Sequence, residues 1–196
     1  REGYTFIGWD KPFDNVTGNI TVKAVYEINK YTVTFIDWDG TVIKTQEVEY
    51  GKGATAPEED PTREGYTFKG WDRPFDNITG NITVKALYQI NKYTVTFLDW
   101  DDTVLKTQEV EYGKGATAPV SPAREGYTFK GWDTDFNRVT GNLTVRAIYE
   151  ANKLSVYFNS MGGSRVDPII EIDYDSKVPE PNPPTREGYD FAGWYK

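Results

Sequence analysis

The sequence predicts a mostly β protein (α+β at most), built as an elongated tandem array of small units with little helix. The stretch Arg-Glu-Gly-Tyr-Thr-Phe-x-Gly-Trp-Asp starts at Arg1, Arg63 and Arg124, and a variant covers residues 186–194. Its first glycine stands at positions 3, 65, 126 and 188, so it recurs after 62, 61 and 62 residues. A fixed spacing of this size is typical of repeat arrays. Between the copies, apolar and polar residues alternate with the period of half-buried strands.

The first expected strand covers residues 19–26, Asn-Ile-Thr-Val-Lys-Ala-Val-Tyr, where apolar and polar residues alternate strictly. The same alternation in residues 31–35, Tyr-Thr-Val-Thr-Phe, predicts a second strand. Residues 41–50 are also extended in character, but their alternation slips between Ile43 and Val48, as a β-bulge would cause.

The two latter strands are expected to form a hairpin whose turn is Asp37-Trp-Asp-Gly40, because Asp-Gly between β-branched residues is a strong hairpin signal. The second copy has Asp102 in place of the glycine, and aspartate also suits turns. The following Gly- and Pro-rich bend, residues 51–62, has room for one helical turn around residues 54–56 at most.

The repeated motif itself predicts a strand whose side chains have a structural role. Simple alternation puts Tyr66 and Phe68 on one face and Trp71 on the other. A bulge at Gly70 would turn the tryptophan inward. We favour the bulge, because an unburied tryptophan in every unit would reduce solubility.

Composition limits the chemistry that the chain can support. There is no His and no Cys, so triads, dyads and most zinc sites are excluded. A carboxylate pair such as Asp37/Asp39 or Asp99/Asp101 would lie on a hairpin surface without an enclosed cleft. We therefore expect no catalytic residue, no cofactor and no enzymatic activity.

Charge and hydropathy exclude two classes of partner. The net charge of −8 argues against nucleic acid, which needs clustered Lys and Arg. No apolar run reaches the ~18 residues that a membrane-spanning helix needs, so no membrane insertion is expected in this segment. The six Trp, fourteen Tyr and ten Phe instead indicate small aromatic-rich cores, which units of ~60 residues need.

The last copy resembles a known family. Its segments are Leu-Ser-Val-Tyr-Phe-Asn-Ser-Met-Gly-Gly-Ser (154–164), Ile-Asp-Tyr (172–174) and Pro-Pro-Thr-Arg-Glu-Gly-Tyr-Asp-Phe-Ala-Gly-Trp-Tyr (183–195). Together they resemble the Listeria–Bacteroides repeat, the family that includes the B-repeats of internalins. The earlier copies resemble it too, although their Asp-Trp-Asp turns replace an Asn/Gly-rich turn.

The resemblance implies small β-grasp-like units carried in tandem on secreted or wall-attached bacterial proteins, hence an extracellular or cell-surface location. It divides the chain into the C-terminal half of a unit (1–29), two complete units (30–91 and 92–152) and the N-terminal part of a divergent unit (153–196). In a β-grasp unit the first and last strands lie parallel, and parallel neighbours cannot be joined by a tight turn. Residues 28–30, 90–92 and 151–153 would then be linkers between units.

The acidic turns are candidate binding sites. Asp99, Asp101 and Asp102 cluster at one turn and are weak candidates for calcium ligands, although their spacing does not fit an EF-hand loop. Solvated turn residues are the commoner alternative.

Trp38 and Trp100, with Asp37 and Asp39 beside the first of them, are candidates for recognition: the ring would stack on a sugar or a protein partner while the acids bond to it. Alternatively, each tryptophan packs on the adjacent unit and stiffens the array.

These features predict a spacer or stalk whose partners are neighbouring repeat units. Linkers of about two to four residues limit reorientation, and each unit would add roughly 25–30 Å to a rod. One alternative is an adhesin that uses the Trp and Asp residues of the tips to bind a host or matrix ligand. Another is end-to-end self-assembly into filaments, in which residues 1–27 of one copy complement residues 153–196 of another by strand addition.

Overall fold

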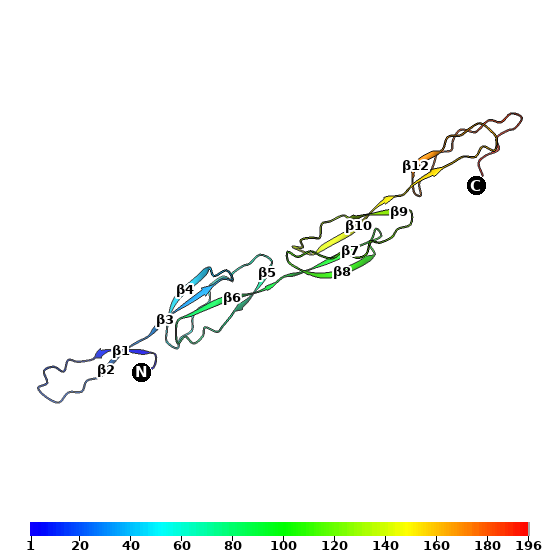
Figure 1. Cartoon of the computed structure of the whole chain (residues 1–196). Coiled ribbons are helices and arrows are strands. Elements are labelled where there is room, and N and C mark those ends of the chain that lie inside the picture. Colours follow the sequence, from blue (N-terminus) through cyan, green and yellow to red (C-terminus); the bar gives the residue numbers. More distant parts are fainter. Residues whose placement is uncertain (196) are drawn as a thin grey trace. The chain divides into compact units, whose positions relative to one another are not determined.

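Figure 1 shows the computed structural model of the chain, which describes residues 1–195. These residues form strands and no helix, so the prediction of a mostly β protein is confirmed, and none of them forms a helix that could cross a membrane. The strands are β1 (Tyr4–Trp9), β2 (Ala24–Ile28), β3 (Lys30–Ile36), β4 (Val42–Glu49), β5 (Tyr66–Trp71), β6 (Ile82–Ile90), β7 (Lys92–Leu98), β8 (Val104–Glu111), β9 (Tyr127–Trp132), β10 (Leu143–Ala151), β11 (Lys153–Val156) and β12 (Ile169–Asp173).

The chain divides into two compact units, Arg1–Asn91 and Lys92–Lys196. Each contains one four-stranded and one two-stranded sheet. In the first unit the four-stranded order is β4-β3-β6-β5, and β1 pairs with β2. In the second unit the four-stranded order is β8-β7-β10-β9, and β11 pairs with β12.

The two central strands of each four-stranded sheet, which come first and last in the sequence of the repeat, lie parallel, as the resemblance to β-grasp units predicted. Val33 of β3 lies opposite Ile82 of β6, and Val95 of β7 lies opposite Leu143 of β10. The other strand pairs are antiparallel. The parallel pair is possible because a hairpin strand, a long bend and β5 separate β3 from β6 in sequence.

Each four-stranded sheet buries one face, because the alternating apolar residues of its strands all point to that side. In the first unit the buried cluster is Val33, Phe35, Val48, Ile78 and Val84. In the second it is Val95, Phe97, Val110, Val139 and Val145. Ile78 and Val139 come from loops, so loops rather than helices cover the core.

Backbone hydrogen bonds hold these covering loops together. Ala54 donates its N–H to the carbonyl oxygen of Phe75 at 2.7 Å, and Ile78 donates to that of Lys52 at 2.8 Å. The possible helical turn around residues 54–56 is absent, because the N–H of Ala54 is used in this contact between loops instead of within a helix.

A bulge interrupts β5 where the sequence indicated one. The register with β6 shifts between Phe68 and Gly70, and Gly70 has a φ of +107°. The shift brings Phe68 and Trp71 to the same face, with ring centroids 5.4 Å apart. Trp71 therefore packs on the core, 4.9 Å from the ring of Phe35.

The bulge in β4 lies near the turn. Ile36 pairs with Val42 and Phe35 pairs with Lys44, so Ile43 is the extra residue. From Lys44 to Glu49 the register is regular, so the bulge lies at the Ile43 end of the predicted interval.

The expected linkers are largely strand. β2 ends at Ile28 and β3 begins at Lys30, so Asn29 alone lies between them, and Asn152 lies likewise between β10 and β11.

Candidate functional site at the hairpin tips

The turn between β3 and β4 is a tight hairpin, as the Asp-Gly signal predicted. Asp37 donates its N–H to the carbonyl oxygen of Thr41 at 2.8 Å, and Gly40 donates to that of Asp37 at 3.1 Å. Gly40 has a φ of +91°, and Asp102 takes the same left-handed region in the second copy with a φ of +68°. Aspartate tolerates this region better than most residues, so both sequences make the turn.

The carboxylates of the first tip accept hydrogen bonds from the protein itself. Asp37 Oδ1 accepts from the N–H of Trp38 and from the hydroxyl of Tyr88, both at 2.7 Å. Asp39 Oδ1 accepts from the N–H of Thr41 at 2.9 Å. These oxygens shape the turn and fix it to β6.

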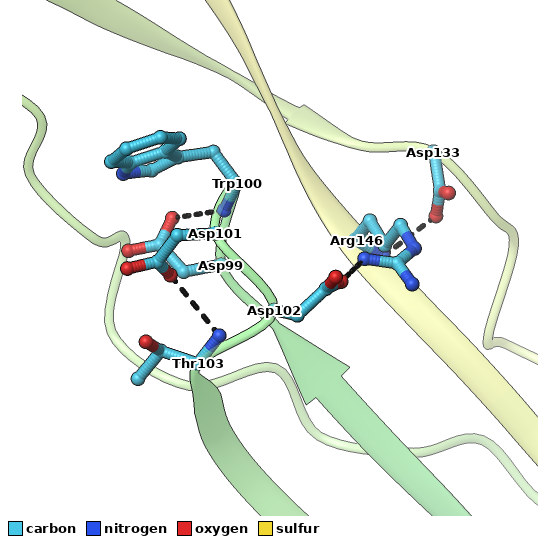
Figure 2. Close-up of polar contacts among 7 residues, drawn as sticks. All are labelled: Asp99, Trp100, Asp101, Asp102, Thr103, Asp133 and Arg146. Atoms are coloured by element: carbon cyan, nitrogen blue, oxygen red, sulfur yellow. Dashed lines mark hydrogen bonds and ion pairs between the residues drawn. The ribbon is translucent and has the colours of Figure 1, made fainter.

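The second tip repeats this arrangement and adds an ion pair (Figure 2). Asp99 accepts from the N–H of Trp100, and Asp101 accepts from the N–H of Thr103. Asp102, which replaces the glycine, pairs with the guanidinium of Arg146 on β10. The three acids weighed as calcium ligands are thus bonded to different protein donors. Among residues 1–195, no group of three acidic side chains is arranged to hold a metal ion.

Each tip tryptophan covers an arginine of the repeated motif. The Cζ of Arg63 lies 4.2 Å from the ring centroid of Trp38 and 3.7 Å from that of Tyr66. In the second copy, the Cζ of Arg124 lies 4.1 Å from Trp100 and 3.7 Å from Tyr127. A guanidinium between two aromatic rings is a favourable cation–π arrangement.

These contacts differ from the packing on an adjacent unit that was one expected role of the tryptophans, whereas ligand recognition stays a prediction. Trp38 and Arg63 belong to the same four-stranded repeat, so the ring packs within its repeat instead of on an adjacent one. One face of the ring is occupied by the arginine, although Trp38 is 45% and Trp100 54% exposed. The residues that we expected to bind a ligand therefore hold the tip against the bend of the same repeat.

The contact of this arginine with the aromatic rings was not predicted from the sequence, although the sequence contains a signal for it. Every copy of the motif has arginine three residues before tyrosine. The guanidinium also lies over the tyrosine in the outer copies, Arg1 over Tyr4 at 3.9 Å and Arg186 over Tyr189 at 4.0 Å. In the last copy, which has no tip tryptophan, Arg186 donates to the carbonyl oxygen of Met161 at its own tip instead.

Burial and the hydrogen bond to Asp37 raise the pKa of Tyr88 from 10.0 to about 12. Burial and the bond to Asp99 raise the pKa of Tyr149 to about 12 as well. The cause is physical in both cases, because an ionised phenolate would be poorly hydrated and would face a carboxylate.

We expect Tyr88 and Tyr149 to ionise as a late phase in an alkaline titration. A pKa raised in the folded state means that their contribution to stability is full below pH 10.0 and is lost as the pH rises through about 12. Tyrosinate absorbance measures the titration. The double variant Tyr88→Phe/Tyr149→Phe should have a late phase that is smaller by these two tyrosines, and a late phase of unchanged amplitude in that variant would contradict the assignment.

We expect Trp38→Ala to lower the free energy of unfolding of its repeat by about 1–2 kcal/mol, through loss of the cation–π contact and of the ring's buried area. Equilibrium denaturation measures this loss, and Trp100→Ala should behave alike. Trp38→Phe is the control, because it keeps an aromatic face over Arg63. An unchanged stability in Trp38→Ala would show that the stack contributes nothing.

Comparisons with known proteins cover the whole chain. A family model described as the Listeria-Bacteroides repeat domain matches residues 31–86, 93–150 and 155–196. A "Putative Gly-rich membrane protein" of Evansella cellulosilytica is 35% identical over 229 residues, covering 100% of this chain and 26% of that protein. Internalin H of Listeria monocytogenes is 39% identical over 178 residues, covering 78% of this chain and 30% of that protein.

A second Evansella cellulosilytica relative, "Putative membrane protein", is 35% identical and covers 90% of this chain and 29% of its own length. The chain thus spans between 26% and 30% of the length of these relatives. Among solved structures, Mub-RV is 15% identical over 64% of this chain and 100% of its own, with a TM-score of 0.20, too low to indicate a shared arrangement.

Proposed function

This chain belongs to the Listeria–Bacteroides repeat family, and from this premise we propose that it is a spacer: a stalk segment whose tandem repeats hold other domains of a longer bacterial protein away from the cell surface. The role is mechanical and not catalytic. This role agrees with the contacts of the tip carboxylates and the motif arginines, because these side chains bond to residues of their own repeat.

The observation that carries the proposal is the parallel pairing of the first and last strands in each complete repeat. Because β3 and β6 run in the same direction, the chain enters the sheet at one end and leaves it at the opposite end. The same holds for β7 and β10. Units that pass the chain from end to end extend an array, whereas units with both ends on one side would fold it back.

Small-angle scattering of the chain in solution tests the proposal. A compact globule of 196 residues would have a radius of gyration of about 16 Å. We expect a clearly larger value and a pair-distance distribution with a long tail. A radius near the compact value would overturn the stalk proposal.

A cell-surface location is part of the same proposal. It is supported by the names of the relatives, two of which are named "Putative Gly-rich membrane protein" and "Putative membrane protein" and the third Internalin H. An adhesive role for the tips, directed at a host or matrix ligand, has less support. Arg63 already covers one face of Trp38, and Asp37 already accepts two intramolecular hydrogen bonds. A ligand would therefore have only the other face of the ring and would have to compete for the carboxylate.

Self-association is a second candidate, favoured by exposed apolar residues in the first 29 residues. Trp9 is 52% and Ile20 48% exposed, whereas the equivalent Trp71 and Ile82 pack on a core strand that carries Val33 and Phe35. A second copy of this chain offers β11 (Lys153–Val156) and the two aromatic residues after it, a Leu-Ser-Val-Tyr-Phe sequence of the kind that would cover this face. Sedimentation velocity over a wide concentration range tests the pairing, and a protein that stays monomeric throughout excludes it.

A further inference from the structure

We infer that the Glu-Gly pair of the repeated motif is a socket for a tyrosine of the following repeat, and that this contact couples neighbouring repeats. The inference rests on the proposed stalk function and gives it a means of limiting bending. Two copies of the contact lie within the compact units. One joins residues 1–29 to residues 30–91, and the other joins residues 92–152 to residues 153–196.

In the first copy, Tyr50 of the following repeat lies directly on Gly3. A Cβ added to Gly3 would overlap the tyrosine ring, and the φ of +72° at Gly3 also disfavours any residue with a Cβ. The hydroxyl of Tyr50 donates to Glu2 Oε1 at 2.6 Å. The glycine, which has no Cβ, thus leaves room for the ring, and the glutamate accepts a hydrogen bond from the hydroxyl at the end of the ring.

The second copy has the same geometry in a different sequence. Gly126 has a φ of +74°, and a Cβ there would overlap the ring of Tyr174. Glu125 raises the pKa of Tyr174, mainly through its charge and also through a hydrogen bond. Tyr174 belongs to the divergent repeat. The residues that precede it differ from those that precede Tyr50 in residues 30–91. Agreement between two unlike sequences indicates that the contact is a property of the motif.

Asparagine at each junction binds the repeats on both sides of it. Asn29 donates its N–H to the carbonyl oxygen of Gly3 at 2.9 Å, and its own carbonyl oxygen accepts from the N–H of Tyr50 at 2.8 Å. Its side-chain Oδ1 accepts from the hydroxyl of Thr5 at 2.6 Å. A residue that is bonded in both directions is not a free hinge.

The second junction asparagine makes the same three bonds. Asn152 donates to the carbonyl oxygen of Gly126 at 2.8 Å and accepts from the N–H of Tyr174 at 2.9 Å. The hydroxyl of Thr128 donates to Asn152 Oδ1 at 2.7 Å. Together, the socket and the junction bonds tie the two sides of each joint at several points, which restricts their relative rotation.

Spin labels on the full chain test the coupling. The chain has no cysteine, so labels on Asp14→Cys and Glu59→Cys, both at exposed positions, report one distance across the first joint. We expect a narrow distance distribution that Gly3→Ala or Tyr50→Ala widens to about twice its width or more. A distribution that is equally wide with and without these substitutions would overturn the inference.

Gly188→Ala is the matched control for backbone strain. Gly188 has a φ of +75°, yet nothing lies within 4 Å of an added Cβ. It therefore carries the same conformational penalty without a tyrosine, and it should leave the label distance unchanged. Gly3→Ala lies outside residues 30–91, so amide NMR resonances of the core strands β3 and β6 that stay unchanged show that the joint, and not the fold, has been altered.

The second joint gives an independent repetition, with labels at Arg138 and Lys177 and with Tyr174→Ala as the disruptive change. The outcome is separable from that of the stalk proposal. A chain that is extended in scattering but has wide label distributions keeps the stalk and excludes the socket. A compact chain with narrow distributions does the reverse.

Discussion

Replacing Phe35 by alanine is expected to lower the free energy of unfolding of its repeat by about 3–5 kcal/mol. The side chain is fully buried at the centre of the first core. Its ring meets Trp71 at 4.9 Å and Phe75 at 5.1 Å between centroids, both edge to face. Alanine would leave a cavity where strand β3, strand β5 and a covering loop meet, and the loop has no helix behind it to close the gap.

The loss is large relative to the stability of so small a unit. A repeat of about 60 residues has about 3–9 kcal/mol in total, so Phe35→Ala should leave it largely unfolded at room temperature. The second repeat keeps Phe97 and should remain folded. Two-dimensional amide NMR separates these outcomes, because the resonances of residues 30–90 would collapse toward random-coil positions while those of residues 92–151 stay dispersed.

The reciprocal variant is Phe97→Ala, which should unfold the second repeat and leave the first one folded. Phe97 is equally buried and meets Trp132 at 5.0 Å and Phe136 at 5.2 Å. If Phe35→Ala instead left both repeats folded with a loss below about 1 kcal/mol, the loops would have to close the cavity almost completely, and the core described for the repeat would be wrong.

Strands, hairpins and the β5 bulge could be predicted because their signals are local. The alternation of Val33 and Phe35 with threonines fixes which face of β3 is buried. Two residues, Asp39 and Gly40, are enough to indicate a tight turn. Parallel pairing of β3 with β6 is not a local property, and only the resemblance to a known family predicted it.

The remaining contacts could not be predicted because they join residues far apart whose own patterns are unremarkable. Trp38 and Arg63 are separated by a strand and a bend, and nothing periodic relates them. Tyr50 looked like the end of a strand, and Gly3 like the start of another. Their contact depends on how one repeat meets the next, which is set by the junction at Asn29.

The motif tryptophan offers the second large effect, and the chain contains its own control. Trp71→Ala should cost about 3 kcal/mol, because the bulge at Gly70 aims the ring onto Phe35. Trp9 occupies the same position in the first copy of the motif and contacts Phe6 in the same way, 5.4 Å between centroids. It is 52% exposed, however. Trp9→Ala should therefore change stability by no more than about 0.5 kcal/mol.

Equilibrium unfolding of the two single variants measures the difference directly. The local sequence is the same apart from position 7, which is Ile7 in one copy and Lys69 in the other. A tenfold or larger contrast in the folding equilibrium of the affected repeat would therefore arise from packing across the core. Equal losses in both variants would mean that the tryptophan acts within its own strand pair. In that case the bulge would stabilise the pairing of β5 with β6 and not the packing of Trp71 on the core. The motif would then stabilise its own strand pair only.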